Sequence, residues 1–260
     1  MISVVACVKD RAESVKLWLE SLALQTMAGM MEVILVDYSS TDGLPKVLED
    51  APIKVNVFRV SIRDKIPGFP EAFLKNVGIR RARCDVIAVT NVDLAYEPKF
   101  FENLSSRCGP GVLVQAVRKD TFKGQEVSAD GVIGERKGQK AKMVIDYLPE
   151  SGLPIVAGAD CQMMTRQFWN IFQGYDEEIY GWGTLDSDLM MRALLWGMTL
   201  TIVGHRHGTY VHRWHDTDIE KNREDVERNH PIIMAKRNAK TIKRNRSDWG
   251  GVSQREAQDE

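Results

Sequence analysis

The chain has 260 residues, of which 43% are hydrophobic, and its net charge at pH 7 is -1. This hydrophobic content can bury the core of a single α/β domain, with or without a helical appendage. A near-neutral chain has no overall attraction for nucleic acid or anionic lipid, so such binding would need a local patch. The four cysteines lack Cys-x-x-Cys spacing, which argues against a zinc cluster and is typical of reduced, structural thiols.

Strand-like apolar runs alternate with amphipathic helices along the chain. Val15, Trp18 and Leu22 mark one face of an early helix, and Val77 and Ile79 lie in a later one. Strands are predicted at residues 2–8, 32–36, 55–60, 85–89 and 111–117. This alternation predicts βαβ units and therefore an α/β fold.

The later part of the chain is less regular. Residues 119–141 are rich in Gly, Lys and Asp without an apolar period, which predicts a mobile loop or an irregular hairpin. A loop of that size beside a site often acts as a lid. A helix is predicted at about 166–172, and residues 218–246 are expected to form a long polar helix or a helix pair.

Polar side chains end the strand-like run at 85–93. Because ligands collect beyond the carboxyl ends of strands in open α/β sheets, Asn91 and Asp93 stand where an anionic ligand or its metal would lie. Their oxygen atoms suit a hard divalent cation. A plain strand-end turn is the alternative, because Asn and Asp are common in turns.

A second candidate site is the sequence Tyr-Gly-Trp-Gly-Thr-Leu-Asp-Ser-Asp-Leu at 180–189. Gly181 and Gly183 allow a tight turn around Trp182, and Asp186 falls near the first turn of the helix that follows. A capping carboxylate with Trp182 in the core is the ordinary alternative for this stretch alone.

Together these stretches resemble glycosyltransferases of the GT-A fold, specifically inverting family 2 enzymes and the related beta-1,4-galactosyltransferase group. The resemblance runs from residue 1 to about 216. Four motifs occur in the family's order. Residues 33–42 are similar to the nucleotide motif Val-Asp-Asp-x-Ser-x-Asp, 75–78 to Arg/Lys-Asn-x-Gly, 91–93 to the Asp-x-Asp metal motif, and 181–188 to Gly-Trp-Gly-x-Glu-Asp-x-Asp.

The resemblance implies a mixed, Rossmann-like sheet flanked by helices. Its nucleotide-sugar half would span about 1–118 and its acceptor half about 142–216, and a C-terminal helical, basic extension would occupy 217–260. Three positions depart from the motifs. Tyr38 replaces an Asp that reads the base in relatives, Asn91 replaces the first Asp of the metal motif, and Leu185 replaces a Glu beside the acceptor.

The resemblance also implies roles for individual residues. Asp186 would be the general base. Donor-binding residues would be Ala6, Arg11, Asp37, Tyr38, Asn76 and Asn91, and acceptor-binding residues would be Trp182, Gly183 and Asp188. The donor would be a nucleotide sugar, with a UDP-sugar favoured.

Mn²⁺ or Mg²⁺ would be held by Asp93 and a late histidine. Four of the five histidines lie between positions 205 and 215, namely His205, His207, His212 and His215. Residues 211–215 resemble the family segment that supplies the metal-binding His, which makes His212 the first choice and His215 the second. A solvated surface cluster is the alternative for these histidines.

The C-terminal extension contains a basic run between Lys236 and Arg246. A solvated helix face is the default interpretation of such a run. Attraction to anionic lipid would suit a lipid-linked glycan acceptor, and attraction to phosphodiester would suit modified nucleic acid, which we rank lower. No signal peptide or membrane-spanning run is found, so we expect a cytoplasmic enzyme, with peripheral contact at the inner membrane face as an option.

These features predict a metal-dependent inverting glycosyltransferase that moves a hexose to a hydroxyl of a glycan or glycolipid. A nucleotidyltransferase is a weaker alternative, because the sequence lacks a Gly-rich phosphate loop followed by Lys. A catalytically weak sugar-nucleotide or glycan-binding module is suggested by Asn91 and Leu185, although Asp93 and Asp186 are both present.

Overall fold

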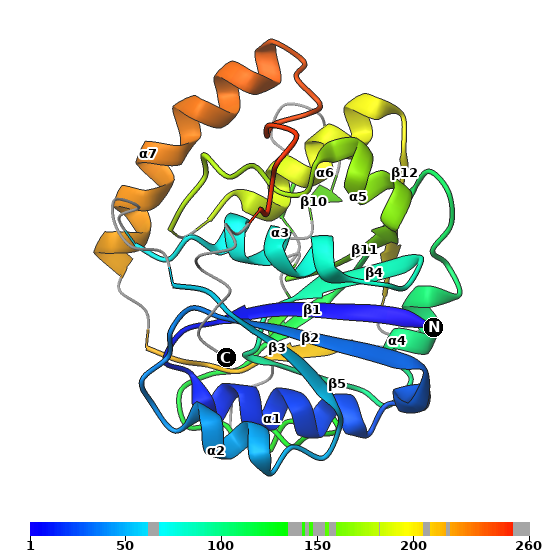
Figure 1. The fold of residues 1–260 in the computed structure, drawn as a ribbon, viewed down its shortest axis with the longest axis vertical. Helices are drawn as coiled ribbons and strands as arrows, with labels where there is room; N and C mark the ends of the chain where they lie inside the picture. The colour runs from blue at the N-terminus through cyan, green and yellow to red at the C-terminus, as the bar shows by residue number, and fades with distance from the viewer. Residues whose placement is uncertain are drawn as a thin grey trace.

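A computed structural model describes residues 1–61, 68–134, 160–181, 183–204, 209–216 and 219–251, together with the backbone at 142–143, 146–147 and 154–155. Its centre is a seven-stranded mixed sheet with helices on both faces (Figure 1). The strands lie in the order β12-β6-β11-β4-β1-β2-β3. They are β1 (Ile2–Val8), β2 (Met31–Asp37), β3 (Val55–Arg59), β4 (Val86–Thr90), β6 (Val112–Ala116), β11 (Cys161–Thr165) and β12 (Thr199–Val203).

The strand directions explain why the sheet is mixed. Strands β4, β1, β2 and β3 are parallel, whereas β11 runs antiparallel between β4 and β6. All seven residues of β1 are buried, as expected for a central strand covered on both faces. The five predicted strands are confirmed to within two residues at each end, but β11 and β12 were not predicted.

Helices cover the two faces of this sheet. On one face lie α1 (Ala12–Ala23) and α2 (Leu44–Glu49), and on the other lie α3 (Glu71–Arg81), α5 (Arg166–Phe172) and α6 (Leu185–Trp196) (Figure 1). The predicted helix at 166–172 is confirmed by α5. A 3-10 turn at Ala28–Met30 and helix α4 (Phe100–Ser105) complete this part of the fold.

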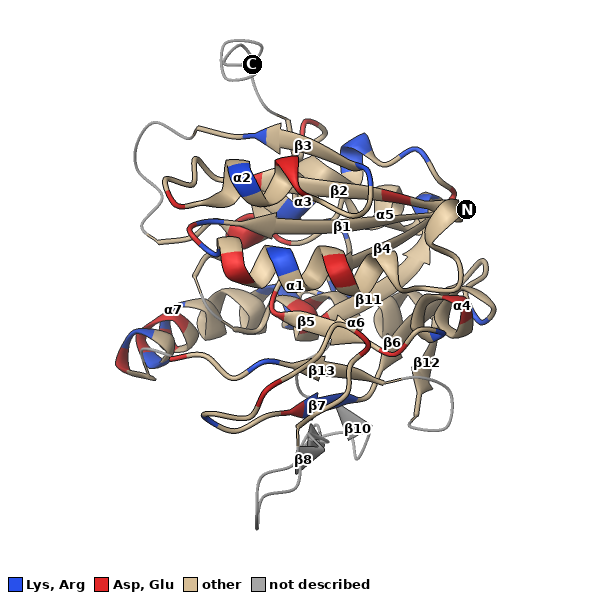
Figure 2. Cartoon of the chain, turned by 90° about the horizontal axis from the view of Figure 1, so that it is seen from below, with Lys and Arg blue, Asp and Glu red and all other residues tan. Residues whose placement is uncertain are grey.

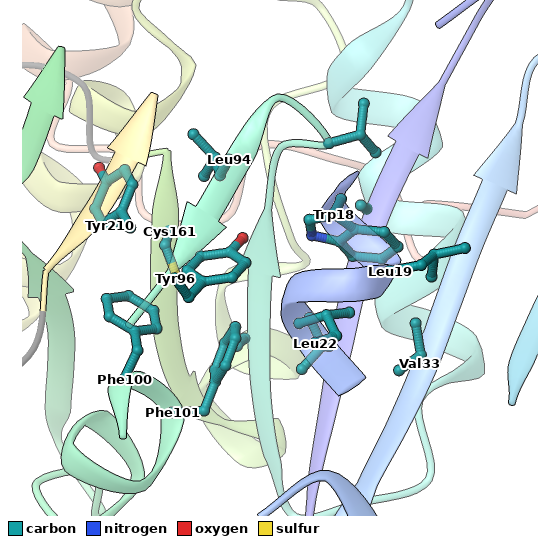
Figure 3. Close-up of a cluster of buried hydrophobic side chains, with 14 of the residues drawn as sticks. Trp18, Leu19, Leu22, Val33, Leu94, Tyr96, Phe100, Phe101, Cys161 and Tyr210 are labelled. Atoms are coloured by element: carbon teal, nitrogen blue, oxygen red, sulfur yellow. The ribbon is translucent and has the colours of Figure 1, made fainter. Parts of the chain in front are cut away.

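Each face of the sheet has its own hydrophobic core. Beneath α1, Trp18 packs in a cluster that also contains Tyr96, Phe100, Phe101 and Tyr210 (Figure 3). Beneath α3 and α6, a second cluster includes the motif position Leu185. Leu185 is therefore a core residue.

A small second sheet, in the order β5-β13-β7-β8, lies beside the large one. Its strands are β5 (Leu94–Tyr96), β13 (Tyr210–His212), β7 (Arg118–Asp120) and β8 (Lys142–Met143), and a separate pair is formed by β9 (Asp146–Tyr147) and β10 (Pro154–Ile155). The predicted loop at 119–141 thus begins inside β7 and contains a bridge between Val127 and Ile133, and residues 135–141 lie outside the described part.

The C-terminal extension is one helix followed by non-helical chain. Helix α7 spans Ile219–Asn238, and residues 239–251 return to the body of the protein, where Trp249 is buried. Of the two forms predicted for 218–246, the single long helix is the one found, and it ends at Asn238. Lysine and arginine alternate with aspartate and glutamate along α7 (Figure 2). Among the described residues, no helix combines the length and apolarity needed to cross a membrane.

The motif residue Gly78 allows α3 to lie close to β1. A Cβ at position 78 would overlap the Val5 side chain and come within 3.2 Å of Val36. We predict that Gly78→Val lowers the free energy of unfolding by about 1–3 kcal/mol, because overpacking forces neighbouring side chains out of their rotamers. Urea denaturation measures this effect. Gly29→Val is the control, because no atom lies within 4 Å of its Cβ position, and an equal loss in both variants would contradict the steric argument.

Candidate active site

The predicted metal-site residues meet where the large sheet ends beside the small one. Strand β4 ends at Thr90, and residues 91–93 then lead directly into β5. Strand β13 pairs with β5 on one side and β7 on the other, so that His212 lies opposite both Leu94 and Asp120. This register brings a late histidine next to the motif at the end of β4.

Asp93 contacts both candidate histidines. Its Oδ2 lies 3.4 Å from Nε2 of His212 and 3.2 Å from Nε2 of His215, and the two imidazole rings are edge to face, with centroids 5.4 Å apart. The backbone N–H of Arg213 also donates to the Asp93 carbonyl. Both histidines considered from the sequence therefore lie at one site, while His205 and His207 are outside the described residues.

This cluster fits a divalent metal. One ligand atom from each of Asp93, His212 and His215 can be chosen so that all three lie within 4.8 Å of one another. Oδ1 of Asp93 is buried and has no hydrogen-bond partner, as expected of an oxygen that binds a metal ion. Two imidazoles and one carboxylate suit Mn²⁺ better than Mg²⁺, which prefers oxygen ligands.

The electrostatics of the cluster follow from these contacts. Burial alone would raise the pKa of Asp93, but hydrogen bonds from His212 and His215 hold that pKa far below its usual range. Burial opposes protonation of His212, yet its contacts with Asp120 and Asp93 raise the pKa of the imidazole to about 10. A cation bound here would take the place of a proton on His212.

A second group of polar side chains supports the cluster through contacts with His212 and Asn91. Nδ1 of His212 lies 3.2 Å from Oδ1 of Asp120, which is also paired with Arg118. Arg118 donates to Asp160 at 2.8 Å, and Asp160 also accepts hydrogen bonds from Asn91 and the Tyr210 hydroxyl. Arg118, Asp120 and Asp160 were not among the predicted site residues, because their proximity depends on strand register.

Asp186 lies in the first turn of α6, as predicted. Its Oδ1 is buried without a hydrogen-bond partner, and burial raises the pKa of the carboxyl to about 7 against the opposing charge of Lys75. The Gln162 amide donates to the backbone carbonyl of Asp186 at 3.1 Å and accepts a hydrogen bond from the Tyr175 hydroxyl. A side chain from strand β11 thus fixes the backbone of Asp186.

A buried lysine lies behind Asp186. The Lys75 side chain is 1% exposed and pairs with Glu71 at 2.6 Å, and its ammonium lies 5.4 Å from the centre of the Tyr175 ring. Burial opposes the charge, but Glu71 and Asp186 raise the pKa of Lys75 well above its usual value. Lys75 is the first residue of the Lys-Asn-x-Gly motif, and its burial is not predictable from sequence because lysine is almost never fully buried unless it is paired.

The donor-side residues near the ends of β1 and β2 have varied surroundings. Asp37 is buried, accepts from the Ser40 N–H at 2.9 Å and pairs with Arg59 at 3.1 Å. The Tyr38 ring lies 4.6 Å from the Lys9 ammonium and 6.2 Å from the Phe69 ring. Of the other predicted donor-binding residues, Arg11 is exposed at the start of α1, and Ala6 is buried in β1.

Two predicted site residues are structural instead. Asn76, expected at the donor, is buried and exchanges hydrogen bonds with the Tyr175 backbone while donating to Glu177. Asp188, expected at the acceptor, is buried between Arg192 and Arg244 at 2.7 and 2.9 Å. The polar groups of both side chains are thus engaged by partners within the protein.

The other two acceptor residues lie in the loop before α6. Gly183 adopts a φ of +86° and packs against Val226, and Trp182 is outside the described residues. The basic run differs from expectation, because Lys236 pairs with the buried Asp176 and Arg244 with Asp188. Binding of membrane or nucleic acid by this run is therefore without structural support.

Comparisons with known proteins agree with this architecture. Residues 3–125 match the model described as Glycosyl transferase family 2, and residues 156–216 match the one described as N-terminal domain of galactosyltransferase. No curated protein sequence matches the chain.

Several solved structures share the fold. The crystal structure of TarS from S. aureus has a TM-score of 0.61 at 15% identity, covering 90% of this chain and 39% of TarS. TarS 1–349 in complex with UDP has a TM-score of 0.61 at 16% identity, with 90% and 64% covered. The mannosyltransferase PcManGT from Pyrobaculum calidifontis, in complex with GDP-Man and Mn²⁺, has a TM-score of 0.58 at 14% identity, with 95% and 66% covered.

The chain thus spans less than two thirds of the length of each of these solved chains. At such low identity the structural likeness concerns the fold, whereas the two family models concern the sequence itself and together match most of the chain. The mixed sheet, the motif order and these matches lead to one conclusion: the chain has the GT-A fold, and its sequence is similar to Glycosyl transferase family 2 over residues 3–125 and to the N-terminal domain of galactosyltransferase over residues 156–216.

Proposed function

We propose that the protein is a metal-dependent inverting glycosyltransferase that moves a hexose from a nucleotide sugar, with a UDP-sugar favoured, to a hydroxyl of a glycan or glycolipid. The observation that carries this proposal is a half-buried carboxylate with a raised pKa, Asp186, whose Oδ1 has no hydrogen-bond partner, near an Asp-His-His cluster. Asp160 links the two, since it lies close enough to both Asp186 and His212 to raise both pKa values.

The similar structures support the choice of donor. TarS 1–349 has been solved with UDP and with UDP-GlcNAc, and PcManGT with GDP-Man and Mn²⁺. We propose that Asp37 and Tyr38, at the end of β2, contact the nucleoside and that Arg11 contacts the ribose or the diphosphate. Tyr38 stands where relatives often carry an acid, so the base would meet an aromatic ring with Phe69 and Lys9 beside it.

The catalytic step assigned to this chain is proton transfer. Ionised Asp186 accepts the proton of the acceptor hydroxyl as that oxygen attacks the anomeric carbon from the face opposite the departing nucleoside diphosphate, so the configuration inverts. A pKa near 7 makes Asp186 a stronger base than an ordinary aspartate, while a large fraction stays ionised at neutral pH. Asp93, His212 and His215 would hold Mn²⁺, which would neutralise charge on the leaving diphosphate.

A sugar-nucleotide-binding module without activity is the second candidate, suggested by Asn91 in the metal motif. Donor hydrolysis by the purified protein, with a panel of UDP-, GDP- and dTDP-sugars in the presence and absence of Mn²⁺, separates the two. Slow, Mn²⁺-dependent turnover of one donor is the expected result. Tight donor binding without any turnover would favour the binding module, and no binding to any donor would contradict both.

The role of Asp186 predicts a selective loss of rate. We expect Asp186→Asn to lower transfer by at least about 10²-fold while donor affinity stays nearly unchanged, because a general base acts only in the chemical step. Initial rates and calorimetry with UDP and Mn²⁺ measure the two quantities. The matched control is Ser187→Ala, and comparable turnover in Asp186→Asn would remove Asp186 from the mechanism.

The raised pKa of Asp186 also predicts a change in stability with pH. Its usual value is 3.8, and in the folded protein it is about 7, so between these values the folded state holds a proton that the unfolded state has lost. This residue therefore lowers stability as pH rises towards 7. We expect the stability of Asp186→Asn relative to the wild type, measured by thermal unfolding, to be greater at pH 8 than at pH 5, where only part of the difference is present. An identical difference at both pH values would contradict the raised pKa.

The contact between Asp120 and His212 predicts a role in metal affinity. A carboxylate on Nδ1 fixes the imidazole so that Nε2 faces the cation, and losing such a partner costs about 10–100-fold in metal affinity. We expect Asp120→Asn to weaken Mn²⁺ binding by that factor in calorimetry. Glu126→Gln, at an exposed position on the same segment, is the control, and equal affinity in the two variants would contradict this role.

A further inference from the structure

The C-terminal segment, residues 219–251, lies beyond both family matches but packs on the acceptor half of the site. Its contacts with residues 173–188 include three that involve charged or amide side chains on α7 and just after it. Arg228 and Asn229 meet the loop before α6, Lys236 meets Asp176, and Arg244 meets Asp188. The chain that carries Asp186 is therefore held from outside the matched regions.

The contacts at the loop are the closest. The Arg228 guanidinium lies 3.8 Å from the centre of the Tyr180 ring, and both Arg228 and Asn229 donate hydrogen bonds to the Tyr180 carbonyl. At Gly181, a Cβ atom would overlap the carboxylate of Asp225. Asp225 is in turn paired with Arg228 at 2.7 Å. Helix α7 is thus fitted to the backbone of this loop.

The residues on either side of this loop, 173–177 and Asp188, are held by buried charges and by hydrogen bonds from the C-terminal segment. Both oxygens of the buried Asp176 accept hydrogen bonds from Lys236. Asp188, one turn after the loop, is paired with the buried Arg244 at 2.9 Å. Asn245 donates to the carbonyls of Gln173 and Tyr175, and the N–H of Gly250 donates to Glu177.

The loop before α6 contains three residues with a positive φ angle. Gly181, Gly183 and Thr184 have φ values of +75°, +86° and +72°. For a β-branched residue such as Thr184, a positive φ is strained, and strained backbone persists only where the surroundings impose it. The α7 contacts supply such a restraint directly upstream of Asp186.

We propose that residues 219–251 position the loop at 180–184, the acceptor loop, and thereby set acceptor binding. Arg228 and Asn229 are the positioning residues. They act through the Tyr180 carbonyl and do not touch the reacting atoms. This inference rests on the proposed transferase function, because it assigns the acceptor to the face of the site that α7 shapes.

The test compares Arg228→Ala with Arg223→Ala. Arg223 lies on the same helix with a side chain that is 74% exposed and pairs only weakly with Glu227 at 3.7 Å, so it is a matched control. Methyl glycosides of glucose, galactose and N-acetylglucosamine serve as acceptor probes, with the donor that the wild type hydrolyses. Calorimetry with UDP and Mn²⁺ reports the donor side independently.

We expect Arg228→Ala to raise the KM for the acceptor probe about tenfold or more, the effect of losing a charged hydrogen bond, with kcat and UDP affinity within about twofold of the control. Arg228→Lys, which keeps a cation over the ring, should recover part of the loss. Asn229→Leu, of similar size, should raise KM in the same direction. An unchanged acceptor KM in Arg228→Ala would overturn the proposal. A rise in KM accompanied by an equal loss of UDP affinity would also overturn it.

Hydrogen exchange decides the question even if the proposed function fails. Failure of that function would appear as no turnover and no UDP binding by the wild type. In either case, amides of residues 176–186 should exchange faster in Arg228→Ala than in Arg223→Ala, while those of β1 and β4 stay unchanged. Equal exchange of residues 176–186 in the two variants would show that α7 does not hold the acceptor loop.

Discussion

The candidate site depends on the pairing of β13 between β5 and β7. Without this pairing, Asp93 would be a polar residue after a strand, and His212 would be a histidine far along the chain. The register sets Leu94 and Asp120 on either side of His212, so that one imidazole has a carboxylate at each nitrogen. A shift of one residue would move His212 to the opposite face and abolish both contacts.

Asp186 shows how competing effects on one carboxylate are decided. A position in the first turn of a helix favours the charged form, and so does the ammonium of Lys75. Burial opposes both, as do the like charges of Asp160 and Glu71, and the net result is a pKa of about 7. The ion pair between Lys75 and Glu71 is part of this balance, because Glu71 holds the lysine and limits how strongly it stabilises ionised Asp186.

Much of the fold could be predicted from local sequence patterns. The parallel strands are continuous apolar runs because both faces of the sheet are covered, and this pattern is visible without tertiary information. Strand β11 was missed because its run is short and contains Gln162, whose amide is used inside the protein to hold Asp186 and Tyr175. The motifs identified Asp93, His212 and His215, but the supporting Arg118, Asp120 and Asp160 come together only through the register of β7.

The motif positions Asn76 and Asp188 are instructive, because each was predicted to bind a ligand and the polar groups of each are hydrogen-bonded or paired inside the protein. Asp188 is neutralised by Arg192 and Arg244, and an unpaired buried carboxylate would be costly. Since Arg244 comes from the segment after α7, the second carboxylate of the Asp-Ser-Asp sequence links the start of α6 to the C-terminal chain. Two residues of the basic run that suggested an external anionic partner, Lys236 and Arg244, therefore pair with Asp176 and Asp188 of the acceptor half.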